Sequence, residues 1–400
     1  MAIINRFTQQ LGITIPVVQA PMGWIARSAL ASAVSNAGGL GIIETSSGEL
    51  DAIREEIKKM GELTDKPFGV NIAQAFVRDP DIVQFVVDQG VRFVTTSAGS
   101  PTRYTAELKA AGLTVFHVVP TLDAALKAID AGVDGLVVEG AEGGGFKNPK
   151  DVSTLVLLPL VRSRTDLPII AAGGFTDGVT MAAALALGAE AVQMGTRMVS
   201  AAESPVHQNW KDAIVSAKET DTVYLNRFHS PALRALRTAR TTALEKEVEK
   251  NIWGEFGDAK ALYFGGDMEA AIALGAEAVQ MGTRMVSAAE SPVHQNWKDA
   301  IVSAKETDTV YLNRFHSPAL RALRTARTTA LEKEVEKNIW GEFGDAKALY
   351  FGGDMEAAIA LTGQVAGRID AVKPVAEILQ AVHDECLETL GKLAKQYLPQ

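Results

Sequence analysis

The first part of the chain alternates short apolar runs with segments of helical periodicity. Each run is rich in β-branched residues, is too short for a helix, and is closely followed by Gly, Pro, Ser or Asn. Such runs, separated by amphipathic helices, predict a parallel sheet, and eight of them close a (β/α)8 barrel. We therefore predict an α/β fold, a TIM barrel, with strands at residues 17–20, 40–43, 68–72, 93–96, 115–119, 136–138, 169–172 and 191–194.

A doubly wound sheet is the alternative fold. That fold usually carries a Gly-x-Gly-x-x-Gly turn after its first strand. Here residues 19–23 read Gln-Ala-Pro-Met-Gly, which is not that turn. The pattern therefore favours the barrel.

From residue 200 to about residue 264 the chain is more charged and is predicted to be helical, as an inserted lid subdomain over the barrel mouth. Arg234, Arg237 and Arg240 recur there at every third residue. They would either meet an anionic ligand or form a solvated stripe on a helix, and the spacing is more typical of the stripe.

The lid belongs to an exact internal repeat. Residues 186–274 are identical to residues 273–361, with a period of 87, so one period subtracted from 400 residues leaves a parent chain of 313. Natural repeats drift while keeping a pattern, so identity indicates a very recent duplication or an artefact of cloning or assembly.

The repeat defines the predicted domain organisation. Because residues 191–194 follow the preceding helix directly, we expect them to fill the barrel and their copy, 278–281, to be displaced. The predicted division is 1–199 for the barrel strands, 200–272 for the first lid copy, 273–286 for the displaced strand, 287–359 for the second lid copy, and 360–400 for a barrel-closing segment and final helix.

Composition narrows the class of protein. The net charge of −9 argues against a nucleic-acid or anionic-membrane partner, and no apolar run is long enough to span a bilayer. The single cysteine, Cys386, allows no disulfide within the chain. The first residues lack a signal-peptide pattern. These features predict a cytoplasmic enzyme, with a homodimer as one arrangement.

The ends of the predicted strands hold the candidate chemistry, because a barrel enzyme places its site there. Gly173 and Gly174 follow the seventh strand, and Gly195 follows the eighth. Backbone N–H groups at such turns suit a phosphate. The other ends offer amides, hydroxyls and carboxylates but no ligand trio for a metal, so we predict no metal. They suit a neutral heteroaromatic ring.

Five motifs together resemble the nitronate monooxygenase (2-nitropropane dioxygenase) family, whose relative is the FMN-dependent enoyl-ACP reductase. They lie at residues 19–23, 35–41, 66–71, 171–178 and 188–197, so the resemblance covers essentially the whole parent chain. It implies a TIM barrel with a lid and non-covalent FMN. Glu139 and Glu142 fit either the flavin site or the organisation of their loop. The cofactor-binding residues are expected to be Met22, Gly23, Asn71, Glu139, Gly173, Gly174, Gln193, Met194, Gly195, Thr196, Gly363 and Gln364.

One departure from the family pattern concerns the catalytic acid/base. The family carries a histidine at the end of a Glu-Ala-Gly-Gly-His loop, whereas residues 142–146 here read Glu-Gly-Gly-Gly-Phe. Phe146 cannot move a proton. His117 is the one histidine in the predicted barrel strands and is the candidate catalytic residue. A structural role on its strand is, however, the more common one for such a histidine.

The missing histidine bears on the reaction. A nitronate has already lost its α-proton, so its oxidation with O₂ needs no protein base, and we predict an FMN-dependent nitronate monooxygenase. An NAD(P)H-dependent flavin reductase acting on enoyl thioesters or quinones is the first alternative, because that reduction gains from a positioned acid. A non-catalytic FMN-binding protein, or an inactive product of the duplication, is the second.

Overall fold

The computed structural model describes residues 3–77, 81–237, 239–248, 250–252, 283–289, 291, 293–313, 319–334, 354, 373, 377, 388–389 and 391–395. The predicted displaced strand at 278–281, the predicted cofactor residues Gly363 and Gln364, and Cys386 lie outside these residues.

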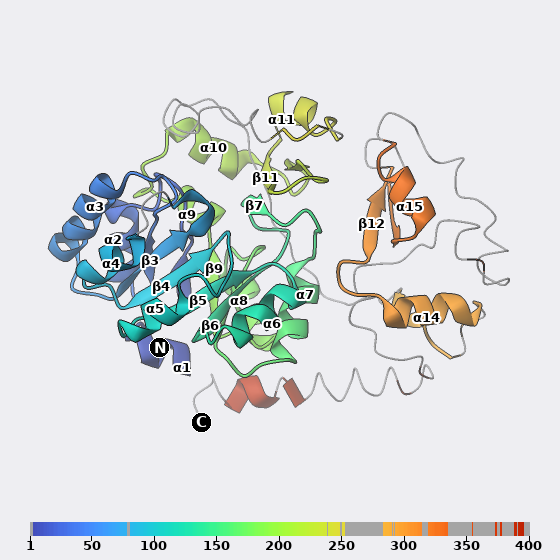
Figure 1. The fold of residues 1–400 in the computed structure, drawn as a ribbon, viewed down its shortest axis with the longest axis horizontal. Helices are drawn as coiled ribbons and strands as arrows, with labels where there is room; N and C mark the ends of the chain where they lie inside the picture. Colours follow the sequence, from blue (N-terminus) through green and yellow to red (C-terminus); the bar gives the residue numbers. More distant parts are fainter. Residues whose placement is uncertain are drawn as a thin grey trace.

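Eight parallel strands form the central barrel (Figure 1). Their order around the sheet is β1-β9-β8-β6-β5-β4-β3-β2, and a bridge between Val18 and Leu40 joins the first strand to the last. The predicted TIM barrel is confirmed. The strands are β1 (Val17–Gln19), β2 (Gly41–Ile43), β3 (Phe68–Ala73), β4 (Phe93–Ser97), β5 (Thr114–Val119), β6 (Gly135–Glu139), β8 (Ile169–Ala172) and β9 (Ala191–Met194).

Strand β9 comes from the first copy of the repeat. It pairs with β1 on one side and with β8 on the other, so Ala191–Met194 occupies the eighth position of the barrel. The direct connection from the preceding helix explains this choice, because a short loop loses the least entropy on closure.

Helices cover the outside of the barrel, and α1 lies at the amino-terminal end of its strands. Within the described residues, no helix has the length and apolar character needed to cross a membrane. The barrel helices are α1 (Arg6–Leu11), α2 (Ser28–Asn36), α3 (Leu50–Leu63), the 3-10 turn η1 (Gln74–Phe76), α4 (Ile82–Asp88), α5 (Thr105–Ala110), α6 (Leu122–Asp130), α7 (Thr154–Arg162), α8 (Gly178–Ala186) and α9 (Thr196–Val199).

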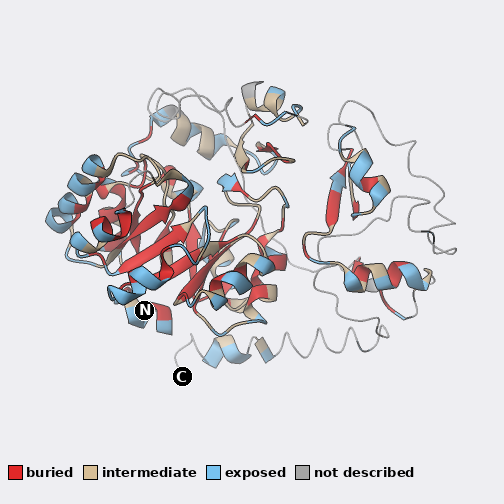
Figure 2. Cartoon of the chain, in the orientation of Figure 1, coloured by how far each residue is buried: buried red, intermediate tan, exposed pale blue. Residues whose placement is uncertain are grey.

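The barrel has a filled lumen, and its strands are buried on both faces (Figure 2). Phe93 and Phe116 meet at 5.2 Å between ring centroids, and Phe7 of α1 closes the same cluster from below. A Cβ added at Gly135 would lie 2.2 Å from the Phe116 ring, so only glycine leaves room for that ring. The lumen is a packed core, and only its carboxyl-terminal mouth is available for a ligand.

The first lid copy contains more β structure than predicted. It comprises α10 (Gln208–Ser216), the hairpin β10 (Thr222–Leu225) and β11 (Ala232–Leu236), and α11 (Ala239–Leu244). Strand β11 also pairs antiparallel with β7 (Gly145–Lys147), a short strand from the loop after β6. The prediction of a wholly helical lid is therefore wrong, because side-chain pairing across the hairpin outweighs the helical propensity of its Ala, Leu and Arg residues.

The second copy repeats the lid elements beside the barrel, to the right in Figure 1. It comprises α13 (Thr283–Val286), α14 (Gln295–Ser303), the hairpin β12 (Thr309–Leu312) and β13 (Leu320–Leu323), and α15 (Ala326–Leu331). Its internal contacts match those of the first copy: the Arg237–Glu245 ion pair of 3.1 Å recurs as Arg324–Glu332 at 3.0 Å. It touches the barrel where the Leu122 amide donates to Glu306 at 3.1 Å.

Candidate active site

The side chains that face the barrel mouth follow from strand alternation. The lumen core contains Phe93, Phe116, Val137 and Ala191, whereas their strand neighbours Val94, Val115, Val138 and Val192 pack outward against the helices. Successive strand residues face opposite sides, so the next inward positions lie two residues further on. Those positions are Thr95, Glu139 and Gln193, and Asn71 of β3 joins them.

Asn71 is held rigidly at the mouth. Its side-chain Nδ2 donates to Thr95 Oγ1 at 2.9 Å and to the Thr95 carbonyl at 3.2 Å, and the side chain is buried. The Thr45 hydroxyl donates to the Asn71 carbonyl at 2.8 Å. This network fixes the direction of the amide, as a residue that orients a ligand requires.

Gln193 offers an unused hydrogen-bond acceptor at the mouth. Its side chain is 9% exposed, and its Oε1 has no partner in the protein. A buried amide oxygen without a partner is costly, so it indicates a ligand that donates to it. By contrast, the Met194 side chain packs in the outer core, so this predicted cofactor residue presents only its backbone, whose carbonyl accepts from Ala20.

The ends of β1 and β9 lie side by side. A Cβ added at Gly195 would lie 3.6 Å from Ala20 Cβ and 3.9 Å from Met22 Sδ. Gly23, in the loop after β1, faces Ser46 of the loop after β2. Thr196 is exposed, and its Oγ1 is 3.7 Å from the position of a Cβ at Gly144. The structure thus gathers Met22, Gly23, Gly195 and Thr196 around one rim.

Gly173 and Gly174 form a left-handed turn after β8, with φ of 90° and 87°. A Cβ added at Gly173 would lie 2.9 Å from the Gly140 carbonyl, so the turn packs directly on the loop after β6. The Thr154 hydroxyl, at the start of α7, donates to the Gly173 carbonyl at 2.8 Å. Only glycine permits both this backbone shape and this close approach.

Glu142 caps the start of α7 from the loop after β6. Its carboxylate accepts from the Thr154 amide at 2.9 Å and from the Thr154 hydroxyl at 3.0 Å. Burial raises the pKa of Glu142, while the hydrogen bonds from Thr154 and the nearby Arg234 oppose that rise. A carboxyl group whose pKa is raised by burial suits proton exchange closer to neutral pH.

A second ion pair stands beside Glu142. The Lys147 ammonium on β7 pairs with the inward-facing Glu139 of β6, and only 4% of the Lys147 side chain is exposed. Gly143 lies between them, since a Cβ there would meet both groups. Lys147 pairs with Glu139, while Glu142 has Arg234 as a nearby positive charge that partly opposes the rise of its pKa.

Phe146 places an aromatic side chain where the family pattern has a titratable histidine. It is 44% exposed on β7, and its ring stacks on Phe76 with 5.3 Å between centroids. An aromatic pair of this kind contacts apolar substituents and supplies no proton.

The candidate catalytic residue His117 faces away from the mouth. Its neighbours Phe116 and Val118 point into the lumen, so His117 lies on the outer face of β5, 4% exposed, with Nδ1 2.7 Å from Thr96 Oγ1. Burial lowers the pKa of His117 from 6.5 to about 4, and a backbone hydrogen bond with Gly99 partly opposes this. This geometry gives the predicted catalytic role of His117 no support, because the ring faces the helices and not the mouth.

Several residues that organise the mouth were not singled out by the sequence patterns. Glu44 is fully buried after β2 and accepts from the Trp24 amide at 3.1 Å, Arg27 Nε at 3.0 Å and the Ser47 amide at 2.8 Å. It ties the loop after β1 to the loop after β2. The sequence signal for Glu44 was a carboxylate directly after a buried strand. The signal for Lys147 was a charged residue directly after the glycine-rich loop.

Arg234 also departs from the sequence prediction. It lies on strand β11 rather than in a helical stripe, and its Nε donates to the Ala141 carbonyl. Arg237 is tied to its own hairpin and to Glu245, and the side chain of Arg240 lies outside the described residues.

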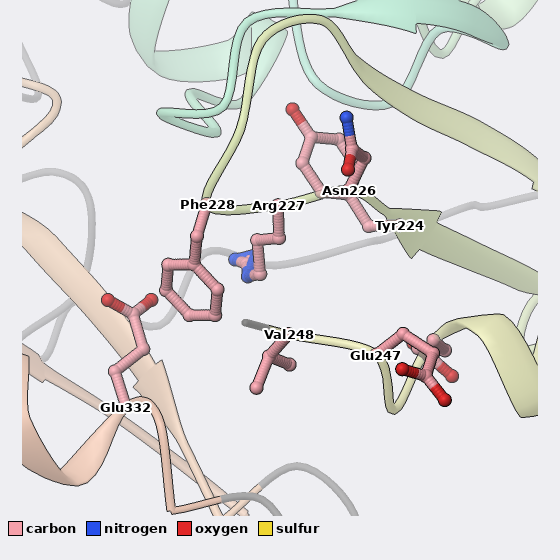
Figure 3. Close-up of a pocket in the computed structure, with 8 residues that line it drawn as sticks. Tyr224, Asn226, Arg227, Phe228, Glu247, Val248 and Glu332 are labelled. Carbon is pink, nitrogen blue, oxygen red and sulfur yellow. The ribbon is translucent and has the colours of Figure 1, made fainter. Parts of the chain in front are cut away.

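A shallow hollow lies away from the mouth, between the two lid copies (Figure 3). Most of its residues come from the first copy, while Glu332 comes from the second. The lining residues are Tyr224, Asn226, Arg227, Phe228, Glu245, Glu247, Val248 and Glu332. No inward-facing strand residue reaches it, so we place the candidate site at the barrel mouth instead.

The fold and the mouth together define an enzyme on a (β/α)8 barrel whose site offers amides, backbone N–H groups and compensated ion pairs. Among the described residues, no group of three or more His, Cys, Asp or Glu side chains is arranged to hold a metal ion.

Comparisons with known proteins identify the family. The sequence matches the nitronate monooxygenase family over residues 5–83, 74–253 and 261–385, and the chain belongs to that family. It is an oxidoreductase. A nitronate monooxygenase from Pseudomonas aeruginosa is 33% identical over 264 residues, which cover 54% of this chain and 75% of that protein.

Two other relatives carry different names. A 5-hydroxy-7a-methyl-1-oxo-octahydro-1H-indene-4-carboxyl-CoA dehydrogenase from Mycobacterium tuberculosis is 39% identical over 248 residues, 61% of this chain and 69% of that protein. The solved structure of FabK from Thermotoga maritima superposes with a TM-score of 0.59 at 32% identity, covering 98% of this chain and 99% of that one. The chain is thus similar to relatives whose names describe different activities.

Proposed function

We propose that this protein is an FMN-dependent oxidoreductase that oxidises alkyl nitronates with O₂. Family membership supports the reaction class, and the unpartnered Oε1 of Gln193 is the observation that carries the cofactor assignment. A flavin ring carries N–H donors, and such a donor would satisfy this buried oxygen. A cytoplasmic location and a homodimer remain parts of the proposal.

The residues at the mouth fit FMN in chemistry as well as in position. The Gly173–Gly174 turn, together with Gly195 and Thr196 on the adjacent strand end, leaves backbone N–H groups for a phosphate. Asn71 and Gln193 flank the ring position. When bound, FMN supplies the electron transfer, while the chain's own residues bind, orient and shield the substrate.

Phe146 selects the substrate in this proposal. A neutral nitroalkane needs a base to remove its α-proton, and the described residues place no histidine at the mouth. A nitronate needs no such step. Its alkyl group suits the Phe76–Phe146 stack, and its negative charge meets a site where Glu139 is paired with Lys147 and burial disfavours the charged form of Glu142.

The test is an aerobic assay of FMN-loaded protein. Oxygen uptake with propyl nitronate, and little or none with the neutral nitroalkane, is expected. The variant Phe146→His should gain activity on the neutral nitroalkane, because it restores a proton acceptor, while Phe146→Leu should not. Absence of oxygen uptake with every nitronate would reject the proposal.

A second candidate is dehydrogenation of an acyl-CoA thioester. The 39% identity to the Mycobacterium tuberculosis dehydrogenase favours it, and Glu142, with a pKa raised by burial, is a carboxylate able to take the α-proton. Anaerobic bleaching of the flavin separates the candidates. Bleaching by an acyl-CoA and not by a nitronate, abolished in Glu142→Gln, would establish the dehydrogenase.

The repeat requires its own test, because residues 186–274 and 273–361 are identical. The second copy forms the same hairpin and helices as the first, as an identical sequence would in a genuine duplication or in an assembly artefact. Intact mass of the protein from its native source decides this: a mass corresponding to 313 residues would show that the second copy is an artefact.

A further inference from the structure

Two arginines of the repeat occupy the same local environment. Arg234 on β11 and its copy Arg321 on β13 each donate to a threonine of the neighbouring strand, Thr222 at 3.0 Å and Thr309 at 3.1 Å. Each guanidinium also lies over a tyrosine ring, Tyr224 at 5.2 Å in the first copy and its counterpart at 5.4 Å in the second. Within the hairpin the two arginines are equivalent.

Outside the hairpin their contacts differ. Arg234 Nε donates to the Ala141 carbonyl in the loop after β6, and strand pairing places Arg234 opposite Gly145. Arg321 instead reaches Asp151 at 3.4 Å, a carboxylate that already pairs with Arg227 at 3.1 Å. Among the described residues, Arg234 therefore contacts the loop at residues 140–144, whereas Arg321 contacts Asp151, further along the same segment between β6 and α7.

We propose that Arg234 is a positioning residue that holds the loop at residues 140–144 against the Gly173–Gly174 turn, and that Arg321 has no such role. This inference rests on the proposed function, because it concerns the same site. It assigns the first lid copy to the assembly of the site and leaves the second copy outside it.

The contacts form a short path from the lid to the cofactor turn. Arg234 donates to the Ala141 carbonyl, and the backbone amide of Ala141 donates to the Val152 carbonyl at 2.7 Å. The next residue, Glu142, accepts from Thr154, whose hydroxyl donates to the Gly173 carbonyl at 2.8 Å. Loss of the first contact removes the bond from Arg234 to the Ala141 carbonyl, while the Ala141 amide and Glu142 keep their own partners.

Arg234 also sets the charge environment of Glu142. Glu139 and Lys147 flank the loop at Gly143, and Tyr224, Asp151 and Arg227 face the guanidinium of Arg234. Because burial already raises the pKa of Glu142, removing the positive charge of Arg234 should raise it further. The acid limb of any activity that needs the Glu142 carboxylate should then move to higher pH.

The chain supplies its own matched control. Arg234→Gln and Arg321→Gln make the same change in the same hairpin sequence, and Asp151 keeps Arg227 as a partner in the second variant. Hydrogen–deuterium exchange of the flavin-free, full-length protein is followed in peptides covering residues 140–147. These residues lie outside the repeat, so their peptides are assigned without ambiguity.

We expect exchange in residues 140–147 to be roughly tenfold faster in Arg234→Gln, the factor expected for a lost hydrogen bond to a charged group. Arg321→Gln should match the wild type. Equal exchange in the two variants overturns the proposal. This measurement needs no activity, so it stands even if nitronates prove not to be substrates.

The pH profile of flavin reduction by an acyl-CoA thioester, the reaction in which Glu142 would take the α-proton, gives the second readout. In Arg234→Gln the acid limb should lie at higher pH than in Arg321→Gln, and Arg234→Lys, which keeps the charge, should restore it. A lower rate with an unmoved acid limb in Arg234→Gln overturns the electrostatic part, because a merely structural defect would lower the rate at every pH.

Discussion

The buried His117 makes the stability of the barrel depend on pH. Burial lowers its pKa from 6.5 to about 4, so the folded protein resists protonating a ring that the unfolded chain protonates readily. Because folding lowers the pKa of His117, the contribution of its neutral ring to the unfolding free energy is fully present above pH 6.5. That contribution is lost as the pH falls toward 4. Each pH unit of separation is worth about 1.4 kcal/mol.

The magnitude follows from the same two values. The two pKa values of His117, in the unfolded and folded chain, differ by about 2.5 units, so roughly 3 kcal/mol of unfolding free energy is lost below pH 4. About 2 kcal/mol of it is already lost at pH 5. Other groups also titrate in this range, so the quantity to measure is a difference between two proteins. The variant His117→Gln keeps a hydrogen-bonding side chain for Thr96 and removes the titration.

The assay is urea unfolding at pH 7.5 and pH 5, followed by tryptophan fluorescence. Between these pH values the wild type should lose about 2 kcal/mol more unfolding free energy than His117→Gln. His207→Gln, at an exposed lid histidine, should behave as the wild type does. Parallel pH dependence in the wild type and His117→Gln, within about 0.5 kcal/mol, would refute both the burial argument and the outward placement of the ring.

Three further predictions concern stability. Asp177→Ala should cost about 1 kcal/mol of unfolding free energy, because Asp177 caps α8 through a capping box with Thr180, whereas Asp166→Ala at an exposed site should cost almost nothing. Gly135→Ala should lower the unfolding free energy by about 1–3 kcal/mol, because the added Cβ would meet the Phe116 ring. The same change at Gly61 of α3, which has open space around it, should stabilise the protein slightly, and equal effects of the two changes in chemical denaturation would contradict the packing. Deleting residues 273–359 should leave the barrel's unfolding free energy within about 1 kcal/mol, because the exposed Lys305–Asp123 pair is weak, and a larger loss in urea would show that the second copy supports the barrel.

Strand positions could be predicted because a strand buried on both faces must be a short apolar run. All eight predicted strands agree with the observed ones to within a residue at each end. The lid hairpin could not be predicted in this way. Residues 232–236 read Ala-Leu-Arg-Ala-Leu, a helix-prone sequence, and they form a strand because β7 and β10 supply partners from distant parts of the chain.

The site was predictable where glycines report backbone shape and less so where contacts cross between elements. Gly173, Gly174 and Gly195 lie at the mouth as their spacing indicates. His117 was proposed from its residue type, whereas the two-residue alternation of β5 places its side chain toward the helices. Arg234 and Lys147 gain their importance from pairing between β7 and β11, which no local pattern contains.

The second hairpin keeps its internal contacts although, within the part of the chain that the structure describes, β13 pairs with β12 alone. Thr325 and Thr328 form the capping box of α15, and Arg324 and Glu332 close the loop below it. A segment whose stabilising contacts lie mostly within itself can be duplicated in a gene without disturbing the packing of the neighbouring elements. Should the native protein carry all 400 residues, selection on the proposed Arg234 contact would act on the first copy only, and the second copy could accumulate substitutions without affecting that contact.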